Sequence, residues 1–449
     1  MPLSDRLLQP LAQVPAPAAP RAGDEEPPVY SELKDELHRR LVDRLDLKNV
    51  EKLPAERIQE ELRAILSSMV GASKVPLNQF ERERLIQDLI DEVTGLGPLE
   101  PLLNDPSISD ILVNTASTVY VERAGKLELT RVRFDSNDHL LRIITRIVSR
   151  IGRRVDESSP MVDARLPDGA RVNAIIPPLA IDGPVLSIRR FGRSPLRARD
   201  LIRLGSVTSE AIGFLGACVQ AKLNILVSGG TGTGKTTFLN ALSAFIPDGE
   251  RVITIEDSAE LQLQQLHVVR LETRPPNVES KGEIVARDLV RNSLRKRPDR
   301  IIIGEVRGAE VLDMLQAMNT GHEGSMTTIH ANSPRDALGR LEAMIGMGGA
   351  ALSESAARQM ISRAIHVLVH VSRGTDGRRR LASICEITGT EGQVISMQEV
   401  FRFNQRSTDG EGHVLGEYAF TGVRPAAMRQ IERAGIDTDQ LLEKHVRRA

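Results

Sequence analysis

Apolar residues between positions 30 and 93 repeat with the spacing of amphipathic helices. Leucines recur at every fourth residue from Leu33 to Leu45, and two further apolar sets follow at 58–69 and 85–93. Proline and glycine residues separate these segments, as expected between helices. The pattern predicts a three-helix bundle over residues 30–95, which we expect to act as a docking module.

The part of the chain from residue 96 to 195 mixes short strand patterns with one helix pattern. We expect strands at 108–113, 118–121 and 185–191, a helix at 139–151 and a hairpin at 163–177. The tripeptide Pro167-Asp168-Gly169 has the composition of the hairpin's turn. These segments predict an α+β N-terminal domain over residues 96–195.

From residue 196 onward, apolar strand patterns alternate with helix patterns. Strands are expected at 225–227, 252–255, 301–303 and 326–329, with helices between them, including 282–294 and 310–318. Such alternation favours an α/β fold, a mainly parallel sheet covered by helices on both faces. Beyond Arg373, glycine-containing turns separate short strands, so we expect an antiparallel extension and a mostly helical end at 425–449.

Composition restricts the classes of function. The 449-residue chain has a formal net charge of −1 and 3% aromatic residues without tryptophan. This composition disfavours a nucleic-acid partner, because the chain has no net positive charge to attract phosphates and few aromatic side chains to stack on bases. The two cysteines, Cys218 and Cys385, exclude a disulfide framework and fit a reducing cytosol. No apolar run reaches the length of a membrane span, and residues 1–29 are expected to form a disordered leader.

The segment LNILVSGGTGTGKTT at 223–237 fits the pattern G-x-x-x-x-G-K-[ST]. An apolar strand precedes this loop and an apolar helix pattern follows it, which favours nucleotide binding over a chance match. Backbone N–H groups of such a loop bind phosphate oxygens, so the predicted cofactors are ATP and Mg²⁺. The predicted cofactor-binding residues are Gly229, Gly230, Thr231, Gly232, Thr233, Gly234, Lys235, Thr236 and Thr237.

Polar residues end three of the expected strands, where ligands of parallel sheets bind. Glu305 is the best candidate to orient or deprotonate an attacking water. His330 would donate to the γ-phosphate, although a strand-end histidine bonded to the backbone is the alternative. Taken one at a time, such groups are usually solvated strand ends. Their occurrence together after a phosphate loop predicts a catalytic site.

The predicted metal site departs from an ordinary Walker B arrangement. Gly304 stands where an aspartate would hold Mg²⁺. The metal would then depend on the Thr236 hydroxyl, phosphate oxygens and water, with Glu256 or Glu260 nearby through water.

Several segments together resemble the secretion ATPase superfamily of type II and type IV secretion and pili. They are the phosphate loop, TIEDSAEL (254–261), RPDRIIIGEVRG (297–308) and TGHEGSMTTIHANSPRDAL (320–338). VDARLPDGARVNAIIPPLAIDGP (162–184), SIRRFGR (187–193) and RLETRPPNVESKGEI (270–284) resemble the CpaF/TadA-like ATPases of tight-adherence (Flp) pilus assembly. The resemblance covers about residues 30–442.

This resemblance implies a RecA-like P-loop ATPase domain over 196–449, with a C-terminal extension and a flexibly joined N-terminal domain. It also implies a homohexamer that is cytoplasmic and peripheral to the inner membrane, with an integral inner-membrane pilus platform protein as partner. Glu256, Glu305 and His330 match functional positions of the Asp, Walker B and His boxes. In relatives, arginines before the ATPase domain contact the terminal phosphate. Among Arg165, Arg171, Arg189 and Arg190, the catalytic candidates are Arg171 and Arg189, and the sequence does not choose between the four.

Three functions stay open at this point. The leading one is an ATP-hydrolysing motor that powers Flp/Tad-type pilus assembly. The alternative within the superfamily is a type IV secretion ATPase for protein or DNA export. A nucleotide-gated scaffold with little hydrolysis is the alternative of another class, and the presence of Lys235, Thr236 and Glu305 argues against it.

Overall fold

The computed structural model forms two compact units, Met1–Arg189 and Arg190–Ala449. It describes residues 28–44, 55–73, 75–123, 125–166, 168–190, 195–274, 276, 281–349, 352–410 and 412–438. The predicted leader therefore lies almost entirely outside the described residues, and so do the last residues of the predicted C-terminal helical segment.

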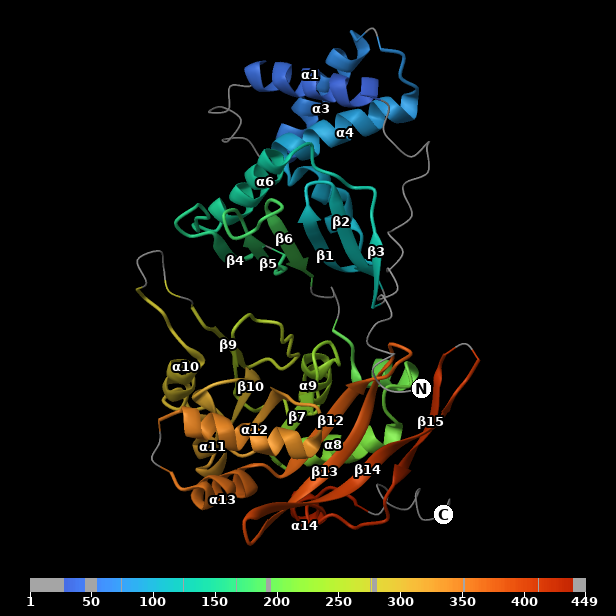
Figure 1. The fold of residues 1–449 in the computed structure, drawn as a ribbon. Helices are drawn as coiled ribbons and strands as arrows, with labels where there is room; N and C mark the ends of the chain where they lie inside the picture. Colours follow the sequence, from blue (N-terminus) through green and yellow to red (C-terminus); the bar gives the residue numbers. More distant parts are fainter. Residues whose placement is uncertain are drawn as a thin grey trace, which may run out of the picture. The chain divides into compact units, whose positions relative to one another are not determined.

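Three helices at the start of the first unit confirm the helical pattern of residues 30–93 (Figure 1). They are α1 (Pro28–Arg44), α3 (Ala55–Gly71) and α4 (Gln79–Thr94). The repeated leucines pack together because their spacing places them on one helix face, and Leu37, Leu41 and Leu66 are almost fully buried. Asn78 and Glu81 form a capping box that fixes the first turn of α4.

An antiparallel six-stranded sheet follows in the order β3-β2-β1-β6-β5-β4. Its strands are β1 (Ile108–Thr115), β2 (Thr118–Arg123), β3 (Lys126–Leu129), β4 (Met161–Arg165), β5 (Arg171–Ile175) and β6 (Val185–Arg189). Helix α6 (Asn137–Ser149) packs its isoleucines into the same core. The predicted strands, helix and hairpin are confirmed. The exposed edge strand β3 was not predicted, because none of its side chains is buried.

A buried ionic cluster joins α6 to the end of α4. His139 is 1% exposed, and its two ring nitrogens lie 2.8 Å from Glu92 Oε1 and 2.9 Å from Asp135 Oδ2. Burial lowers the pKa of His139, but the hydrogen bonds with Asp135 and Glu92 outweigh it and raise that pKa to about 9. The charged imidazolium therefore belongs to the packing of these two helices.

The second unit is built on one nine-stranded sheet in the order β15-β14-β13-β12-β7-β11-β10-β8-β9. Six strands are parallel: β7 (Ile225–Gly229), β8 (Val252–Glu256), β9 (Val268–Glu272), β10 (Arg300–Val306), β11 (Met326–His330) and β12 (Val367–Arg373). The antiparallel extension consists of β13 (Arg379–Glu391), β14 (Val394–Thr408) and β15 (Val414–Phe420). The strand order around β7 is that of a RecA-like fold, so the predicted fold class is confirmed.

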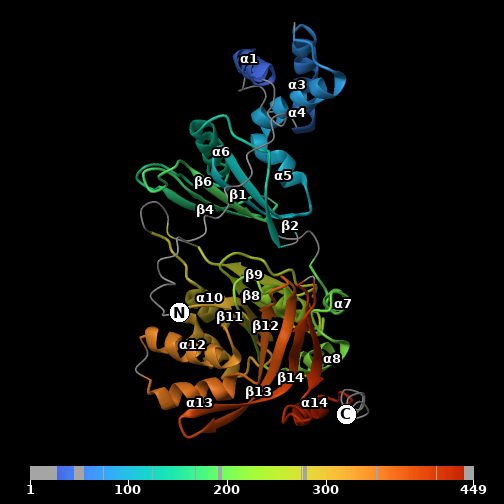
Figure 2. The same ribbon diagram turned by 45° about the vertical axis from the view of Figure 1, so that its right-hand side comes forward.

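Helices cover both faces of this sheet (Figures 1 and 2). Residues of α8 (Ser209–Gln220), α9 (Lys235–Ser243) and α14 (Met428–Arg433) share one core with alternate β7 residues. The opposite core holds residues of α10 (Ala286–Ser293), α11 (Glu310–Asn319), α12 (Pro334–Met347) and α13 (Glu354–Ala364). The short helix α7 (Ala198–Arg203) precedes α8. The predicted start of α10 was wrong, because Ile284 pairs with Arg274 in an isolated bridge before the helix begins.

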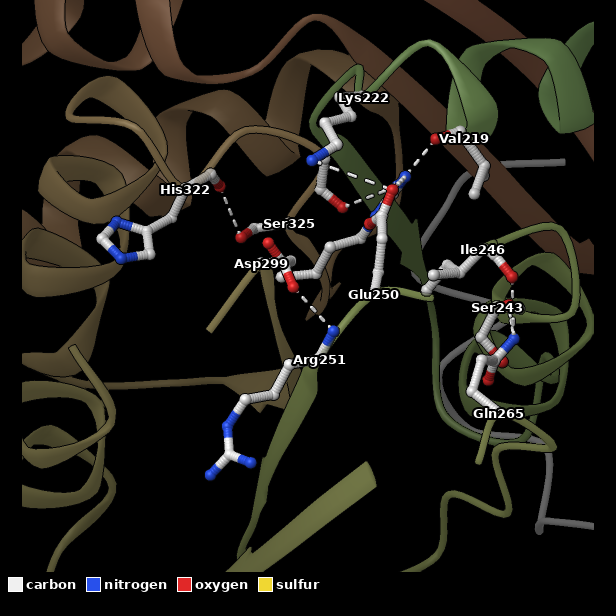
Figure 3. A network of polar contacts seen from close by, with 12 residues as sticks. Val219, Lys222, Ser243, Ile246, Glu250, Arg251, Gln265, Asp299, His322 and Ser325 are labelled. Carbon is white, nitrogen blue, oxygen red and sulfur yellow. Dashed lines mark hydrogen bonds and ion pairs between the residues drawn. The ribbon is translucent and has the colours of Figure 1, made fainter. Parts of the chain in front are cut away.

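The amino ends of the parallel strands meet around one fully buried arginine. The Arg300 guanidinium donates two hydrogen bonds to Glu250 and another, of 2.7 Å, to the Val219 carbonyl. Figure 3 shows Glu250 in this network, with Lys222 Nζ 3.8 Å from its carboxylate. His322, whose carbonyl accepts from Ser325, lies at this end of β11 and so at the edge opposite to the phosphate loop.

The His139 cluster generates a pH prediction. The histidine pKa is 6.5 in the unfolded chain and about 9 in the folded chain, so its stabilisation is present below pH 6.5 and is lost as the pH rises through 9. A shift of this size corresponds to on the order of 3 kcal/mol. Hydrogen exchange of α6 amides, corrected for intrinsic rates, should accelerate by about 100-fold across that range.

His139→Gln is the control for this experiment, because glutamine does not titrate. Its corrected exchange should be fast and nearly independent of pH. Equal pH profiles in the wild-type chain and the variant would show that the imidazolium does not hold α6 against α4.

Candidate active site

The phosphate loop connects β7 to α9 through backbone conformations that require glycine. Gly232 and Gly234 have φ values of 70° and 92°, and Gly234 is the N-cap of α9. A Cβ atom on Gly229 would lie 2.4 Å from the Val371 carbonyl oxygen. Lys235 Nζ donates to the Gly230 carbonyl over 3.0 Å. The loop is therefore closed on itself, with the first turn of α9 and its N–H groups behind it.

The parallel order brings three predicted strand-end groups to the edge that carries this loop. His330 of β11 pairs with Gly229 of β7. On the next two strands, Ile303 pairs with Ile255, so Glu305 and Glu256 leave neighbouring strand ends. The His330 imidazole is half-buried and makes no hydrogen bond to the described residues. The structure thus places β7, β11, β10 and β8 with their candidate groups along one edge.

Glu305 lies between two cations. Its Oε1 atom is 3.8 Å from Lys235 Nζ, and its Oε2 atom is 3.4 Å from the Arg307 guanidinium. Arg307 also pairs with Asp257 at the end of β8, with 2.9 Å between Nη2 and Oδ2. Arg307 was not predicted as a site residue. Its position two residues after Glu305 could have indicated it, because residues two apart in an extended segment lie on the same side.

Glu256 is buried and holds the turn that follows β8. Its Oε2 atom accepts hydrogen bonds from the backbone N–H groups of Glu260 and Leu261, at 2.7 and 2.9 Å. Its Oε1 atom is buried without a hydrogen-bond partner among the described residues. Burial raises the pKa of Glu256 above its usual value, against the effect of the two N–H groups. Glu260 contributes its backbone here, and a metal-binding role for its carboxylate stays a prediction.

The glycine at position 304 has a steric cause. A Cβ atom there would lie 3.0 Å from Glu256 Cγ, so the buried glutamate occupies the space that a larger residue would need. The Gly304 carbonyl also accepts from the Thr328 hydroxyl at 2.7 Å. In this chain, the Glu256 side chain of β8 lies next to Gly304, the position at which an ordinary Walker B segment of β10 would have an aspartate.

The candidate arginines of the first unit form a row across its sheet. Arg171 pairs with Arg165 of β4 and with Arg189 of β6, so these three side chains leave the sheet on the same face. Arg171 lies 3.8 Å from Asp163, and Arg165 donates to the Gly169 carbonyl at 3.2 Å. Arg190 follows directly after β6 and, by strand alternation, is not in the row. Contact of these arginines with phosphate stays a prediction.

A buried histidine beneath the loop was also missed by sequence reasoning. His370 of β12 lies beside Ser228 of β7, with 2.9 Å between Nδ1 and Oγ. Burial lowers the pKa of His370, which keeps its ring neutral near pH 7. A neutral ring suits this position, because a protonated imidazole would place another positive charge directly beside the strand that carries the loop.

The family model of the type II/IV secretion system proteins matches residues 92–415. The chain belongs to this family. A putative conjugal transfer protein of Mycobacterium tuberculosis strain H37Rv is 41% identical over 332 residues, covering 73% of this chain and 92% of that protein. The type IV secretion system protein VirB11 of Brucella suis is 32% identical over 314 residues, covering 64% of this chain and 87% of VirB11.

The crystal structure of the VirB11 ATPase from the Brucella suis type IV secretion system, in complex with sulphate, has 30% sequence identity to this secretion ATPase. It covers 64% of this chain and 95% of the VirB11 chain, with a TM-score of 0.36. The resemblance to the secretion ATPase superfamily is confirmed by the family match. Within the described residues, no helix is long and apolar enough to cross a membrane.

Gly304 provides a test of the crowding beside Glu256. Gly304→Ala should displace the Glu256 side chain and disturb the turn at 257–261. ATP turnover should fall by about 10-fold, which corresponds to an increase of about 1.4 kcal/mol in the activation free energy. Gly339→Ala in α12 is the control, because nothing lies within 4 Å of a Cβ atom built there. The control should turn over ATP normally and melt at an equal or higher temperature. Equal turnover in both variants would show that the site tolerates a side chain at position 304.

Proposed function

We propose that this secretion ATPase hydrolyses ATP at the edge formed by β7, β11, β10 and β8. The observation that carries the proposal is the 3.8 Å separation between Lys235 Nζ and Glu305 Oε1. This separation places a cation that can bind the terminal phosphate next to a carboxylate that can orient water, as phosphoryl transfer to water requires.

Each residue then has a distinct role. The loop amides of 229–237 and the Lys235 ammonium bind the β- and γ-phosphates. Glu305 orients the attacking water and accepts its proton. His330, at the end of the strand between β7 and β10, donates to the γ-phosphate oxygen. Glu256 supports the neighbouring strand end through the N–H groups of Glu260 and Leu261.

The residues present suit Mg²⁺ as the metal. The Thr236 hydroxyl would hold it together with phosphate oxygens and water, because Mg²⁺ keeps several waters and binds few protein ligands. The buried Glu256 Oε1 atom, without a partner among the described residues, would accept from such a water. When bound, the ion neutralises charge that develops on the β- and γ-phosphate oxygens.

We further propose that the chain works as a homohexamer and that arginines of the first unit complete the site. The row Arg165, Arg171 and Arg189 supports this proposal, because three guanidinium groups on one face make a local positive charge. An arginine that reaches the γ-phosphate stabilises charge in the transition state. Assembly would take place in the cytoplasm, at the periphery of the inner membrane.

The cargo has two candidates. Assembly of a Flp/Tad-type pilus, through an integral platform protein of the inner membrane, is supported by the segments at 162–184, 187–193 and 270–284. Export of protein or DNA by a type IV system is supported by the relatives, a putative conjugal transfer protein and a type IV secretion system protein. Deleting the gene and scoring surface pili and plasmid transfer separately would decide between them.

Glu305→Gln tests hydrolysis against the scaffold alternative. Glutamine keeps the size and hydrogen-bonding capacity of the side chain but does not accept the proton of water. We expect retained ATP binding and a turnover lower by about 10²–10⁴-fold. Phosphate release and equilibrium binding should be measured on the same preparation. Parallel loss of binding and turnover, or no change in either, would assign a structural role to Glu305.

The arginine row offers a matched pair of variants at adjacent positions. Arg189→Ala or Arg171→Ala should lower turnover by up to about 10³–10⁵-fold, the value of an engaged arginine finger. ADP binding should stay nearly intact, because ADP has no γ-phosphate. Arg190→Ala removes the same charge outside the row and should change turnover little. Equal turnover in the Arg189 and Arg190 variants, at concentrations spanning ring assembly, would contradict the proposed role of the row.

A further inference from the structure

The hairpin formed by β12 and β13 lies against the phosphate loop at two points. At the start of the loop, the Val371 carbonyl of β12 occupies the space where Gly229 would carry a Cβ atom. At the middle of the loop, Arg379 Nε donates to the Gly232 carbonyl over 2.9 Å. Its Cδ atom lies 3.4 Å from a Cβ atom built on Gly234. The side chain of Arg379 therefore follows the loop from Gly232 to the residue that caps α9.

A buried ion pair fixes the turn of this hairpin. The Asp376 carboxylate accepts hydrogen bonds of 2.9 and 2.6 Å from the Arg380 guanidinium, and only 1% of its side chain is exposed. The Asp376 oxygens also accept from the N–H groups of Arg378 and Val414. The hydrogen bonds from Arg380 lower the pKa of Asp376 well below its usual range, so the pair stays charged. These contacts of Asp376 hold the turn between β12 and β13, and this turn positions the backbone of Arg379.

The guanidinium of Arg379 keeps unused donors beside an anion-binding loop. Only its Nε–H bonds to the described residues, and neither Nη atom makes a hydrogen bond or ion pair with them. A second guanidinium is close, because Arg373 Nη1 lies 3.8 Å from a Cβ atom built on Gly232. Two cations near one loop residue repel one another, and an anion bound between them would replace this repulsion with attraction to both. Phosphate oxygens match the fork of donors that arginine presents.

We propose that Arg379 is a second phosphate-binding cation of the site, supplied within the same subunit by the β12–β13 hairpin. Its Nε–H holds the Gly232 carbonyl, and its Nη–H groups donate to phosphate oxygens of the nucleotide that Lys235 binds. This inference rests on the proposed function, because it requires that the loop binds nucleotide. Arg379 lies outside the phosphate loop, outside the segments 254–261, 297–308 and 320–338, and outside the arginine row of the first unit.

The test is nucleotide affinity of the full chain, measured with Mg²⁺ and a fluorescent, non-hydrolysable ATP analogue. Arg379→Ala should raise Kd about 10- to 100-fold, the usual value of a hydrogen bond to a charged group. Arg379→Lys, which keeps the charge without the fork, should fall between the wild-type chain and the alanine variant. Arg378→Ala is the matched control, because it removes the same charge from the neighbouring residue, and its Kd should stay within about two-fold of wild type.

A purely structural role has a different signature. If Arg379 only held the hairpin against the loop through its Nε–H, Arg379→Lys would bind the analogue as weakly as Arg379→Ala. That result, or a Kd of Arg379→Ala equal to that of Arg378→Ala, would overturn the inference alone. A wild-type chain that does not bind the analogue would instead overturn the proposed function. The supporting result is a smaller rise in the melting temperature of Arg379→Ala than of the wild-type chain when the analogue is added, each measured from its own melting temperature without nucleotide.

Discussion

The attraction between Lys235 and Glu305 depends on the order of three strands. β7 carries the loop, β10 carries the glutamate, and β11 separates them, so the two side chains approach one another across a full strand width. This order is stable because apolar residues of both sheet faces are buried under helices. At the amino ends, the buried Arg300 ties β10 to the segments that precede β7 and β8. The carboxyl edge is left for polar groups, as in other open parallel sheets.

The same edge explains how the site departs from an ordinary Walker B arrangement. Glu256 reaches from β8 into the space beside Gly304, and two backbone N–H groups offset only part of the cost of burying its carboxylate. The Glu256 carboxylate is thus desolvated and holds the turn after β8, while Glu305 stays more exposed between Lys235 and Arg307. Two glutamates on neighbouring strands therefore have different environments, which allows different roles in one reaction.

The features that the sequence predicted correctly are those encoded by residues close together in the chain. The phosphate loop was found because its glycines and lysine act through adjacent backbone groups. The helices of 30–93 and the strands at 225–227 and 301–303 were found because burial on a helix face or in a parallel sheet leaves a regular apolar pattern. β9 escaped prediction because its residues are only partly buried. Arg379 escaped because its contact with Gly232 joins residues 147 positions apart, and no local pattern records such a pairing.

The central claim is that the loop of 229–237 binds the nucleotide that the protein hydrolyses. Its most direct test is binding and turnover of Mg·ATP by Lys235→Ala, with Lys296→Ala as a control for the loss of one exposed lysine. The account predicts that Lys235→Ala keeps its melting temperature without nucleotide but loses both binding and hydrolysis, while the control keeps both. Near-normal turnover in Lys235→Ala would contradict the assignment of the phosphate loop and the site built around it.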